Sequence, residues 1–333
     1  MSKIKWWKYV GILRQVLGQS RFSKIQLYAK FFQIFIKDYG WFKPRTKFDK
    51  QTYVFIIDGK TIHGGLSDRL RGLFSVYAYC KKNNNDFKIY WKYPFCLEDY
   101  LQPNKVDWLI YDNKPLSYNL NDVDFKFFNS YCELNGKSEE YFDLLKSRKK
   151  EIHVYTNVTI EENRYASFFE ELFIPTKPLK DAVAKCKNEI GGDYISVTYR
   201  FIGILGDFVD DERFKKKQDD MDVDLYIQKS ISFIEKLHID YSHYKILVTA
   251  DSNLFLSKLK NIPYVYTIPG RLEHMDRTKN TDFNVHLKPF VDFLMISSAY
   301  KCFTYSVGNM FKGTKFAKTA ALIGGRELKE INE

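Results

Sequence analysis

HGGLSDRLRGL, residues 63–73, joins a strand-like run to a helix-like run and decides the fold. Residues 52–58 before it (TYVFIID) are β-branched and aromatic, as a buried strand is. Apolar residues then recur at the spacing of one helical face: Leu66, Leu70, Leu73 and Tyr77. The two glycines leave room for a ligand close to the backbone, and Ser67 is expected to cap the helix. A strand, a glycine turn and a helix N-terminus together favour the binding of an anion.

The remaining chain alternates strand-like and helix-like segments, which indicates α/β units around mostly parallel sheets. The first half predicts strands over residues 87–91, 106–111 and 151–157, and helices over residues 139–150 and 162–173. The second half predicts strands over residues 194–200, 244–251, 264–268 and 301–305, and helices over residues 179–190, 224–238, 254–260 and 291–299.

The segment Pro175-Thr176-Lys177-Pro178 separates these halves and is typical of a domain junction. We therefore predict an α/β protein with two Rossmann-like domains, residues 51–176 and 177–333, that face each other across a cleft. A basic amphipathic segment, residues 1–50, precedes them.

Three further motifs lie in the second half. YISVTYR is a strand that ends at Arg200, and ILVTADS is a strand that ends at Asp251 and Ser252. TKFAKTA, residues 314–320, follows a helix-like run and a strand. Ligands of α/β proteins bind at the carboxyl ends of the strands, so these residues are candidate binding positions.

In order and spacing, these motifs resemble those of the fucosyltransferase superfamily of GT-B glycosyltransferases, which includes bacterial α-1,2- and α-1,6-fucosyltransferases and protein O-fucosyltransferases. GGLSDRL is similar to the family's glycine turn, YISVTYR to its strand ending in His-x-Arg, and ILVTADS to its strand ending in Thr-Asp or Ser-Asp. TKFAKTA resembles the element Ser-x-Phe-Ser-x-x-Ala. The resemblance spans residues 52–323. Thr198 replaces the family's histidine and Ala317 its second serine, departures that a different sugar or a changed donor would explain.

The resemblance implies the GT-B fold, a nucleotide-sugar donor, and an arginine that holds the donor diphosphate in place of a metal ion. Arg200 is the expected arginine, because its planar fork matches phosphate oxygens; a surface ion pair is the alternative. The other expected donor-binding residues are Gly64, Gly65, Asp251, Ser252, Asp292, Thr314, Lys315, Phe316 and Ala317. Helix capping is the alternative interpretation of both Asp251 and Asp292.

A transferase also needs a base for the acceptor hydroxyl. His63 is the first candidate, because it lies at the glycine turn and its ordinary pKa suits proton removal near neutrality. Asp68 is the second candidate, although a carboxylate in a first helical turn also favours the helix dipole. Asp207, Asp210 and Asp211, in the loop after Arg200, are further alternatives.

We expect neither a cofactor nor a metal ion. The pair of aspartates in Asp222-Val223-Asp224 precedes a predicted helix and has the form of a cap, so we do not interpret it as a metal-binding Asp-x-Asp motif. The five cysteines are odd in number and scattered, which argues against disulfides and a zinc site and favours a reducing, cytoplasmic location. We interpret them as buried small apolar residues.

Positive charge is concentrated at the start of the chain. Residues 1–50 contain twelve Lys and Arg and two Asp, or +10 of the net +11, so the remainder is nearly neutral, which argues against a nucleic-acid partner. Aromatic and aliphatic residues interleave with these cations, which suits an anionic membrane surface. An equally good interpretation is a helical pair packed on the protein with its cations in water. The apolar runs near the start are too short to cross a bilayer.

The sequence therefore predicts a metal-independent, inverting glycosyltransferase that moves fucose from GDP-fucose to a glycan or glycolipid acceptor in cell-surface polysaccharide synthesis. Its predicted location is the cytoplasm, on the inner face of the membrane through residues 1–45. The alternatives are the same fold with another nucleotide sugar, a catalytically silent protein that binds a glycan or a nucleotide, and a membrane-surface scaffold.

Overall fold

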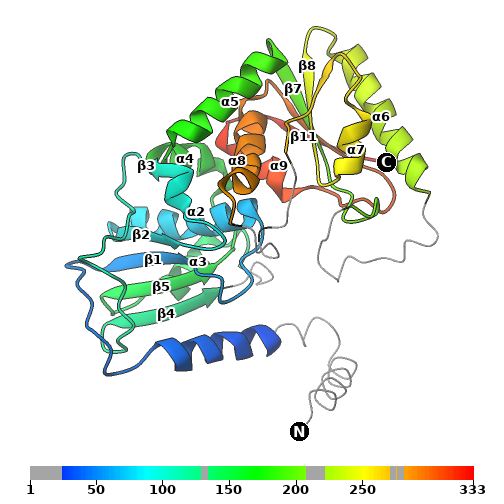
Figure 1. The fold of residues 1–333 in the computed structure, drawn as a ribbon. Helices are drawn as coiled ribbons and strands as arrows, with labels where there is room; N and C mark the ends of the chain where they lie inside the picture. The colour runs from blue at the N-terminus through cyan, green and yellow to red at the C-terminus, as the bar shows by residue number, and fades with distance from the viewer. Residues whose placement is uncertain (1–24, 129–133, 208–221, 271–274, 276–280) are drawn as a thin grey trace.

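The computed structural model describes residues 25–128, 134–207, 222–270, 275 and 281–333, and these residues form two α/β units (Figure 1). The first unit has a parallel sheet in the order β2-β1-β5-β4, made of β1 (Thr52–Ile57), β2 (Asp86–Trp91), β4 (Val123–Phe128) and β5 (Glu151–Thr156). Its helices are an unlabelled helix over residues 25–38, α2 (Leu66–Asn83), α3 (Ser138–Leu145) and α4 (Tyr165–Leu172). Short 3-10 turns cover Leu97–Asp99 and Glu162–Arg164.

The second unit has a parallel sheet in the order β11-β10-β7-β8-β9. Its strands are β7 (Tyr194–Tyr199), β8 (Lys245–Ala250), β9 (Val265–Tyr266), β10 (Cys302–Ser306) and β11 (Leu328–Asn332). Its helices are α5 (Lys177–Ile190), α6 (Val223–Asp240), α7 (Asn253–Lys258), α8 (Phe283–Ser298) and α9 (Lys315–Ile323). A small antiparallel pair is formed by β3 (Leu101–Pro103), which follows β2 in sequence, and β6 (Phe173–Pro175), which precedes α5.

Strand β1 is buried along its whole length because both faces of its sheet are covered. Tyr53, Phe55 and Ile57 belong to the core that contains α2, whereas Val54 and Ile56 belong to a second core with helix 25–38. Figure 1 shows this helix on the face of the sheet opposite to α2. The central strand therefore reads as a continuous apolar run with no polar alternation.

Apolar packing continues between the two units. One core includes residues of α2 and α4 as well as of α5, α8 and α9. The Tyr100 ring stacks between Phe283 and Phe290 of α8, with ring centroids 4.8 and 4.7 Å apart. Lys318 of α9 pairs with Glu162 at 2.6 Å. In Figure 1, the carboxyl ends of β1 and of β7 face the same side of the molecule.

Several sequence predictions need correction. Residues 106–111 form no strand; the segment is extended and holds β2 by a bond from the Ile89 N–H to the Trp108 carbonyl, at 2.9 Å. Helix α8 begins at Phe283, eight residues before the predicted start, and accommodates Pro289. β4 was not predicted, although Val123, Phe125 and Phe127 alternate as a half-buried strand does.

The part of the basic segment that the structure describes packs against the sheet, since Phe31 and Ile34 are buried there. Residues 1–24, with half of its cations, lie outside the described residues. Among the described residues, no helix has the length and apolarity to span a bilayer. Cys80, Cys186 and Cys302 are buried as predicted, but Cys96 is only half-buried; Cys132 lies outside the described residues.

Candidate active site

The glycine turn has the backbone shape that its residues dictate. Gly64 has a φ of +82°, and a Cβ there would lie 2.7 Å from the Cβ of Asp68, so only glycine fits. At Gly65 a Cβ would meet nothing within 4 Å, which leaves this backbone open to a ligand. Gly65 is the N-cap residue of α2, and its N–H donates to Asp68 Oδ2 at 3.3 Å. The expected cap by Ser67 is wrong, because Ser67 already lies inside the helix.

Two buried arginines of α2 brace this turn. Arg69 is fully buried; its Nε donates to the Gly64 carbonyl at 2.9 Å and its Nη1 to the Tyr93 carbonyl at 2.6 Å. Arg71 donates to Thr159 Oγ1 at 2.8 Å and also pairs with Asp68. These arginines stabilise the turn from inside, which explains why the motif contains them.

His63 lies in a polar cluster at the carboxyl end of β1. Its Nε2 accepts a hydrogen bond from the Gly59 N–H at 3.1 Å and lies 3.5 Å from Asp58 Oδ1, and its side chain is 4% exposed. Tyr155 donates to Asp58 Oδ2 at 2.8 Å, and Lys60 pairs with the same oxygen at 3.5 Å. Burial acts to raise the pKa of Asp58, but the nearby His63 ring and the hydrogen bonds from the Lys60 N–H and Tyr155 lower it below its ordinary value.

Sequence reasoning missed Asp58 as part of the site. Its position directly after the buried strand β1 is the signal that could have found it, because strand ends carry functional residues in parallel sheets. Asp68, in contrast, has a side chain that is 33% exposed, so it is the more accessible of the two candidate bases.

Arg200 directly follows β7, and a nearby segment of the same chain, which contains Phe311, holds its backbone. The Arg200 carbonyl accepts from the Phe311 N–H at 3.0 Å, and its guanidinium lies 5.8 Å from the centre of the Phe311 ring. Asp251, at the end of β8, accepts from the N–H groups of Phe201 at 2.7 Å and Ile202 at 2.9 Å. Arg200 and Asp251 are therefore brought together at the carboxyl ends of the adjacent parallel strands β7 and β8.

Ser252 and Asp207 form a small network beside this turn. Ser252 caps α7 by accepting from the Phe255 N–H at 3.0 Å, so the alternative in which Asp251 is the cap is wrong. Asp207 Oδ2 accepts from the Ser252 hydroxyl at 3.1 Å and from the Leu254 N–H at 2.6 Å. Asp210 and Asp211 lie outside the described residues. The predicted cap of α6 is confirmed, since Asp222 accepts from the Leu225 N–H at 3.0 Å.

Asp292 is a buried ion-pair residue in the middle of α8, so helix capping does not explain it. Lys288 Nζ lies 2.9 Å from its Oδ1 and also donates to the Ile268 carbonyl at 3.1 Å. Burial raises the pKa of Asp292 above its ordinary value, although the nearby Lys288 acts in the opposite direction.

The TKFAKTA element begins helix α9, with Thr314 as its N-cap residue. Thr314 and Ala317 are buried, Lys315 is exposed, and the Phe316 ring packs edge-on against Phe293 at 5.4 Å. The first N–H groups of a helix and its dipole favour an anion, so this end of α9 suits a phosphate. Phe311, three residues upstream, links the element to Arg200.

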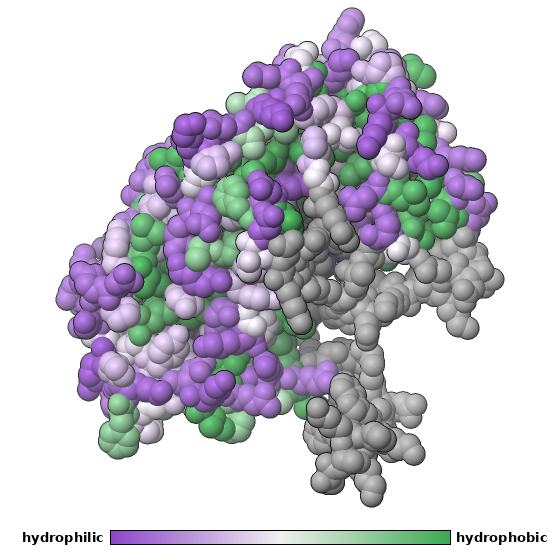
Figure 2. Space-filling model, viewed as in Figure 1, coloured by the Kyte–Doolittle hydropathy of each residue, from purple (hydrophilic) through white to green (hydrophobic). Residues whose placement is uncertain are grey.

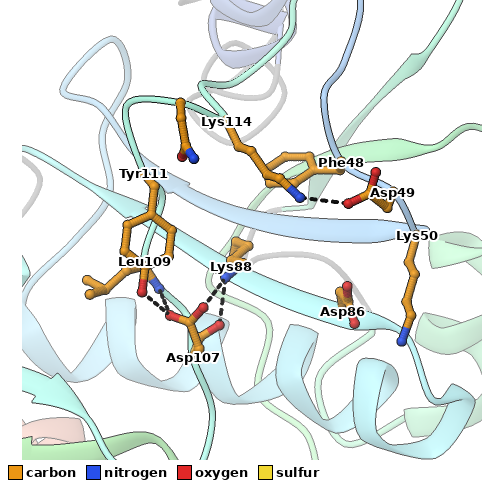
Figure 3. Close-up of a pocket in the computed structure, with 10 residues that line it drawn as sticks. Phe48, Asp49, Lys50, Asp86, Lys88, Asp107, Leu109, Tyr111 and Lys114 are labelled. Atoms are coloured by element: carbon orange, nitrogen blue, oxygen red, sulfur yellow. Dashed lines mark hydrogen bonds and ion pairs between the residues drawn. The ribbon is translucent and has the colours of Figure 1, made fainter.

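A polar cavity of about 390 Å³ lies at the opposite edge of the first sheet, around the amino ends of β1 and β2 (Figure 3). Figure 3 shows two ion pairs in its lining, Lys88 with Asp107 at 2.9 Å and Lys114 with Asp49 at 2.6 Å, together with Lys50 and Asp86. Because Lys88 and Lys114 are each paired with a carboxylate and the cavity lies away from the strand carboxyl ends, we do not assign the donor to this cavity. Among the described residues, no group of three His, Cys, Asp or Glu side chains could hold a metal ion.

No protein-family model matches the chain, and no curated protein matches it significantly in sequence. Solved structures do match. NodZ α-1,6-fucosyltransferase soaked with GDP-fucose shares 14% identity over 83% of this chain and 93% of its own, with a TM-score of 0.51. Fucosyltransferase NodZ from Bradyrhizobium shares 13% identity over 83% of this chain and 94% of its own, with a TM-score of 0.50. A mutant of Arabidopsis thaliana FUT1 in complex with GDP shares 12% identity over 90% of this chain and 73% of its own, with a TM-score of 0.54. The predicted GT-B fold and its likeness to fucosyltransferases are confirmed; at such identities the likeness concerns the fold.

Proposed function

We propose that the protein is a glycosyltransferase that moves fucose from GDP-fucose to a hydroxyl group of a glycan acceptor. The position of Arg200 carries the proposal: it follows β7 in a GT-B fold, beside a carboxylate-held turn and the N-terminal end of α9. A guanidinium and a helix N-terminus are the groups that a leaving diphosphate needs. The structures with this fold include one soaked with GDP-fucose and one in complex with GDP.

In the proposed reaction, the acceptor oxygen attacks the anomeric carbon of fucose while the bond from that carbon to the diphosphate oxygen breaks. The acceptor proton goes to Asp68 or His63, and the negative charge of the departing GDP is balanced by Arg200. Attack opposite the leaving group inverts the anomeric configuration. The donor-binding roles of Gly64, Gly65, Asp251, Ser252 and residues 314–317 belong to this proposal, as do the domain limits given above.

The proposed reaction requires no metal ion, because Arg200 supplies the positive charge that a cation would otherwise supply. The proposed acceptor is a cell-surface glycan or glycolipid precursor. The proposed location is the cytoplasmic face of a membrane, reached through the basic segment of residues 1–45.

Two measurements test the function. Thermal-shift screening of the full chain against GDP, UDP, CMP and dTDP compounds should give its largest stabilisation with GDP ligands. Incubation with GDP-fucose and a panel of glycan acceptors, with and without EDTA, should release GDP at the same rate in both cases. A larger shift with another nucleotide favours a different donor, and GDP binding without any turnover favours a catalytically silent protein. Loss of turnover in EDTA with rescue by Mg²⁺ or Mn²⁺ contradicts the role given to Arg200.

A further inference from the structure

Helix 25–38 has a second apolar face that is largely exposed to solvent. Of its residues, Tyr28 also packs edge-on against Phe127 of β4, with ring centroids 6.3 Å apart. Phe31 and Ile34 point into the core, while Ile25, Tyr28, Phe32 and Ile36 recur three or four residues apart on the outer side. The last three of these are 64%, 63% and 62% exposed. The helix is thus apolar over more than the stripe that it buries, which is unusual for a surface helix of a water-soluble domain.

The apolar surface continues past the end of the helix. Trp41 and Phe42 follow within one turn and are 60% and 103% exposed. Lys60 reaches Asp38, near the end of the helix, at 2.8 Å, which places the loop that carries the exposed Ile62 beside it. We call Tyr28, Phe32, Ile36, Trp41 and Phe42 the outer apolar face. Figure 2 shows hydrophobic residues at the lower margin of the molecule, next to a band of hydrophilic ones.

Positive charge accompanies this face. Exposed Lys30 and Lys37 lie on the flank of the helix between its inner and outer apolar sides, and Lys43 and Lys47 follow. Residues 25–50 contain six Lys and Arg and two Asp, which gives +4. Of these acids, Asp38 is paired with Lys60 and Asp49 with Lys114. Exposed aromatic side chains bordered by lysines are the composition that anionic lipid surfaces bind.

We infer that the outer apolar face is a docking surface for an anionic lipid bilayer, into which Phe32, Ile36, Trp41 and Phe42 insert. A second copy of the chain is a poor occupant, because it would bring the same positive surface against this one. Residues 1–24 are a poor occupant for the same reason, since they carry six Lys and Arg and no acidic residue. The inference deepens the proposed membrane location and does not depend on the transferase activity.

The test is flotation of the full chain with vesicles of phosphatidylcholine alone or of equal parts phosphatidylcholine and phosphatidylglycerol. Only the anionic vesicles should retain the protein. The double variant Phe32→Ser, Ile36→Ser should partition more than about tenfold less, because it removes two apolar side chains from lipid. Its Tm and its shift with GDP should match those of the wild type, because both side chains are exposed. A control variant, Ile239→Ser with Tyr300→Ser, removes two exposed apolar side chains from the second unit and should bind normally.

A fluorescence measurement locates the contact. In a Trp6→Phe, Trp7→Phe variant, Trp41 is the exposed tryptophan that remains, since Trp91 and Trp108 are buried. Its emission should shift to shorter wavelength on anionic vesicles and be quenched by brominated lipids. Unchanged Trp41 emission, or normal vesicle binding by the Phe32 and Ile36 double variant, overturns the inference. So does a dimer in solution that dissociates in this double variant. Absence of any GDP shift in all variants contradicts the proposed function and leaves the docking result standing.

Discussion

Asp251 accepts a hydrogen bond from the Phe201 N–H at 2.7 Å and thereby joins the carboxyl ends of two adjacent strands, β8 and β7. Its second oxygen accepts from the Ile202 N–H at 2.9 Å, and Ile202 has a φ of +49°. A β-branched residue rarely adopts this left-handed conformation, which costs on the order of 1 kcal/mol. The carboxylate therefore holds a strained turn immediately after Arg200, and we assign it a positioning role there.

Replacing Asp251 by alanine should release this turn. We expect the Asp251→Ala variant to lose about 2 kcal/mol of unfolding free energy, because the buried Phe201 N–H and the part-buried Ile202 N–H lose their acceptor. It should also bind GDP more weakly, since Arg200 is no longer held. Adding Ile202→Gly removes the strain and should recover part of the GDP affinity. Urea unfolding and GDP titration measure both effects; unchanged GDP affinity in Asp251→Ala would show that the turn does not position Arg200.

Arg200→Ala should reduce turnover on the order of a hundredfold or more with little change in Tm, because it removes the charge that we propose faces the leaving diphosphate. Arg326→Ala is a suitable control, since Arg326 is an exposed arginine at the far end of α9. The measurement is GDP release at saturating donor. Turnover of Arg200→Ala within a few-fold of the Arg326→Ala rate would rule out the assignment.

Much of the fold was predictable because its signals are local. The strands β1, β5, β7 and β8 are apolar runs that end at turn residues. Such continuous apolar runs are typical of strands in a parallel sheet whose two faces are both covered. Residues 106–111 have a similar apolar composition, but they make single hydrogen bonds instead of a continuous strand ladder. One of these bonds runs from Trp108 Nε1 to the Leu172 carbonyl at 2.7 Å. Whether an extended segment joins a ladder depends on tertiary neighbours, which periodicity does not contain.

The candidate site was less predictable, since contacts made far along the chain decide the environment of each side chain. The sequence places His63 at the glycine turn but does not show that Tyr155, on another strand, completes the cluster around Asp58. Likewise, Asp292 was an expected donor-binding residue, yet its burial beside Lys288 follows from how α8 packs. Spacing brings residues to a strand end; it does not say which of them face inward.

The Lys288–Asp292 pair should respond to substitution mainly through stability. Lys288→Met leaves a buried carboxylate without its cation and should cost about 3 kcal/mol at neutral pH. Because burial raises the pKa of Asp292, the folded protein favours the protonated carboxyl more than the unfolded chain does. The contribution of this group to stability is therefore full at low pH and is lost as pH rises through its folded-state pKa. The cost should therefore shrink in acid, and the double variant Lys288→Met, Asp292→Leu should recover most of it. Urea unfolding at several pH values measures this. A large loss of GDP affinity in a folded Asp292→Asn variant would instead support donor contact.

The two candidate bases should behave differently. Asp68→Asn should lower kcat strongly and leave the GDP-fucose Kd nearly unchanged, because a base acts on the acceptor hydroxyl. The acidic limb of the pH–rate profile should disappear in that variant. Asp181→Asn is a matched control, since Asp181 is another helical carboxylate with a basic partner, Lys177 at 2.5 Å.

His63→Ala should act on stability, because His63 Nε2 faces the Gly59 N–H and the Asp58 carboxylate. The contacts that lower the pKa of Asp58 stabilise the folded protein at every pH above the ordinary aspartate pKa of about 3.9. This contribution is lost as pH falls through the lower pKa that Asp58 has in the folded state. The stability difference between wild type and His63→Ala should therefore be full at neutral pH and narrow below about pH 4. Acid titration of unfolding and steady-state kinetics together decide the base. A large kcat loss in a stable His63→Ala, with normal rates in Asp68→Asn, would assign it to the histidine. Near-normal rates in both would move it to residues 207–211 or to the substrate.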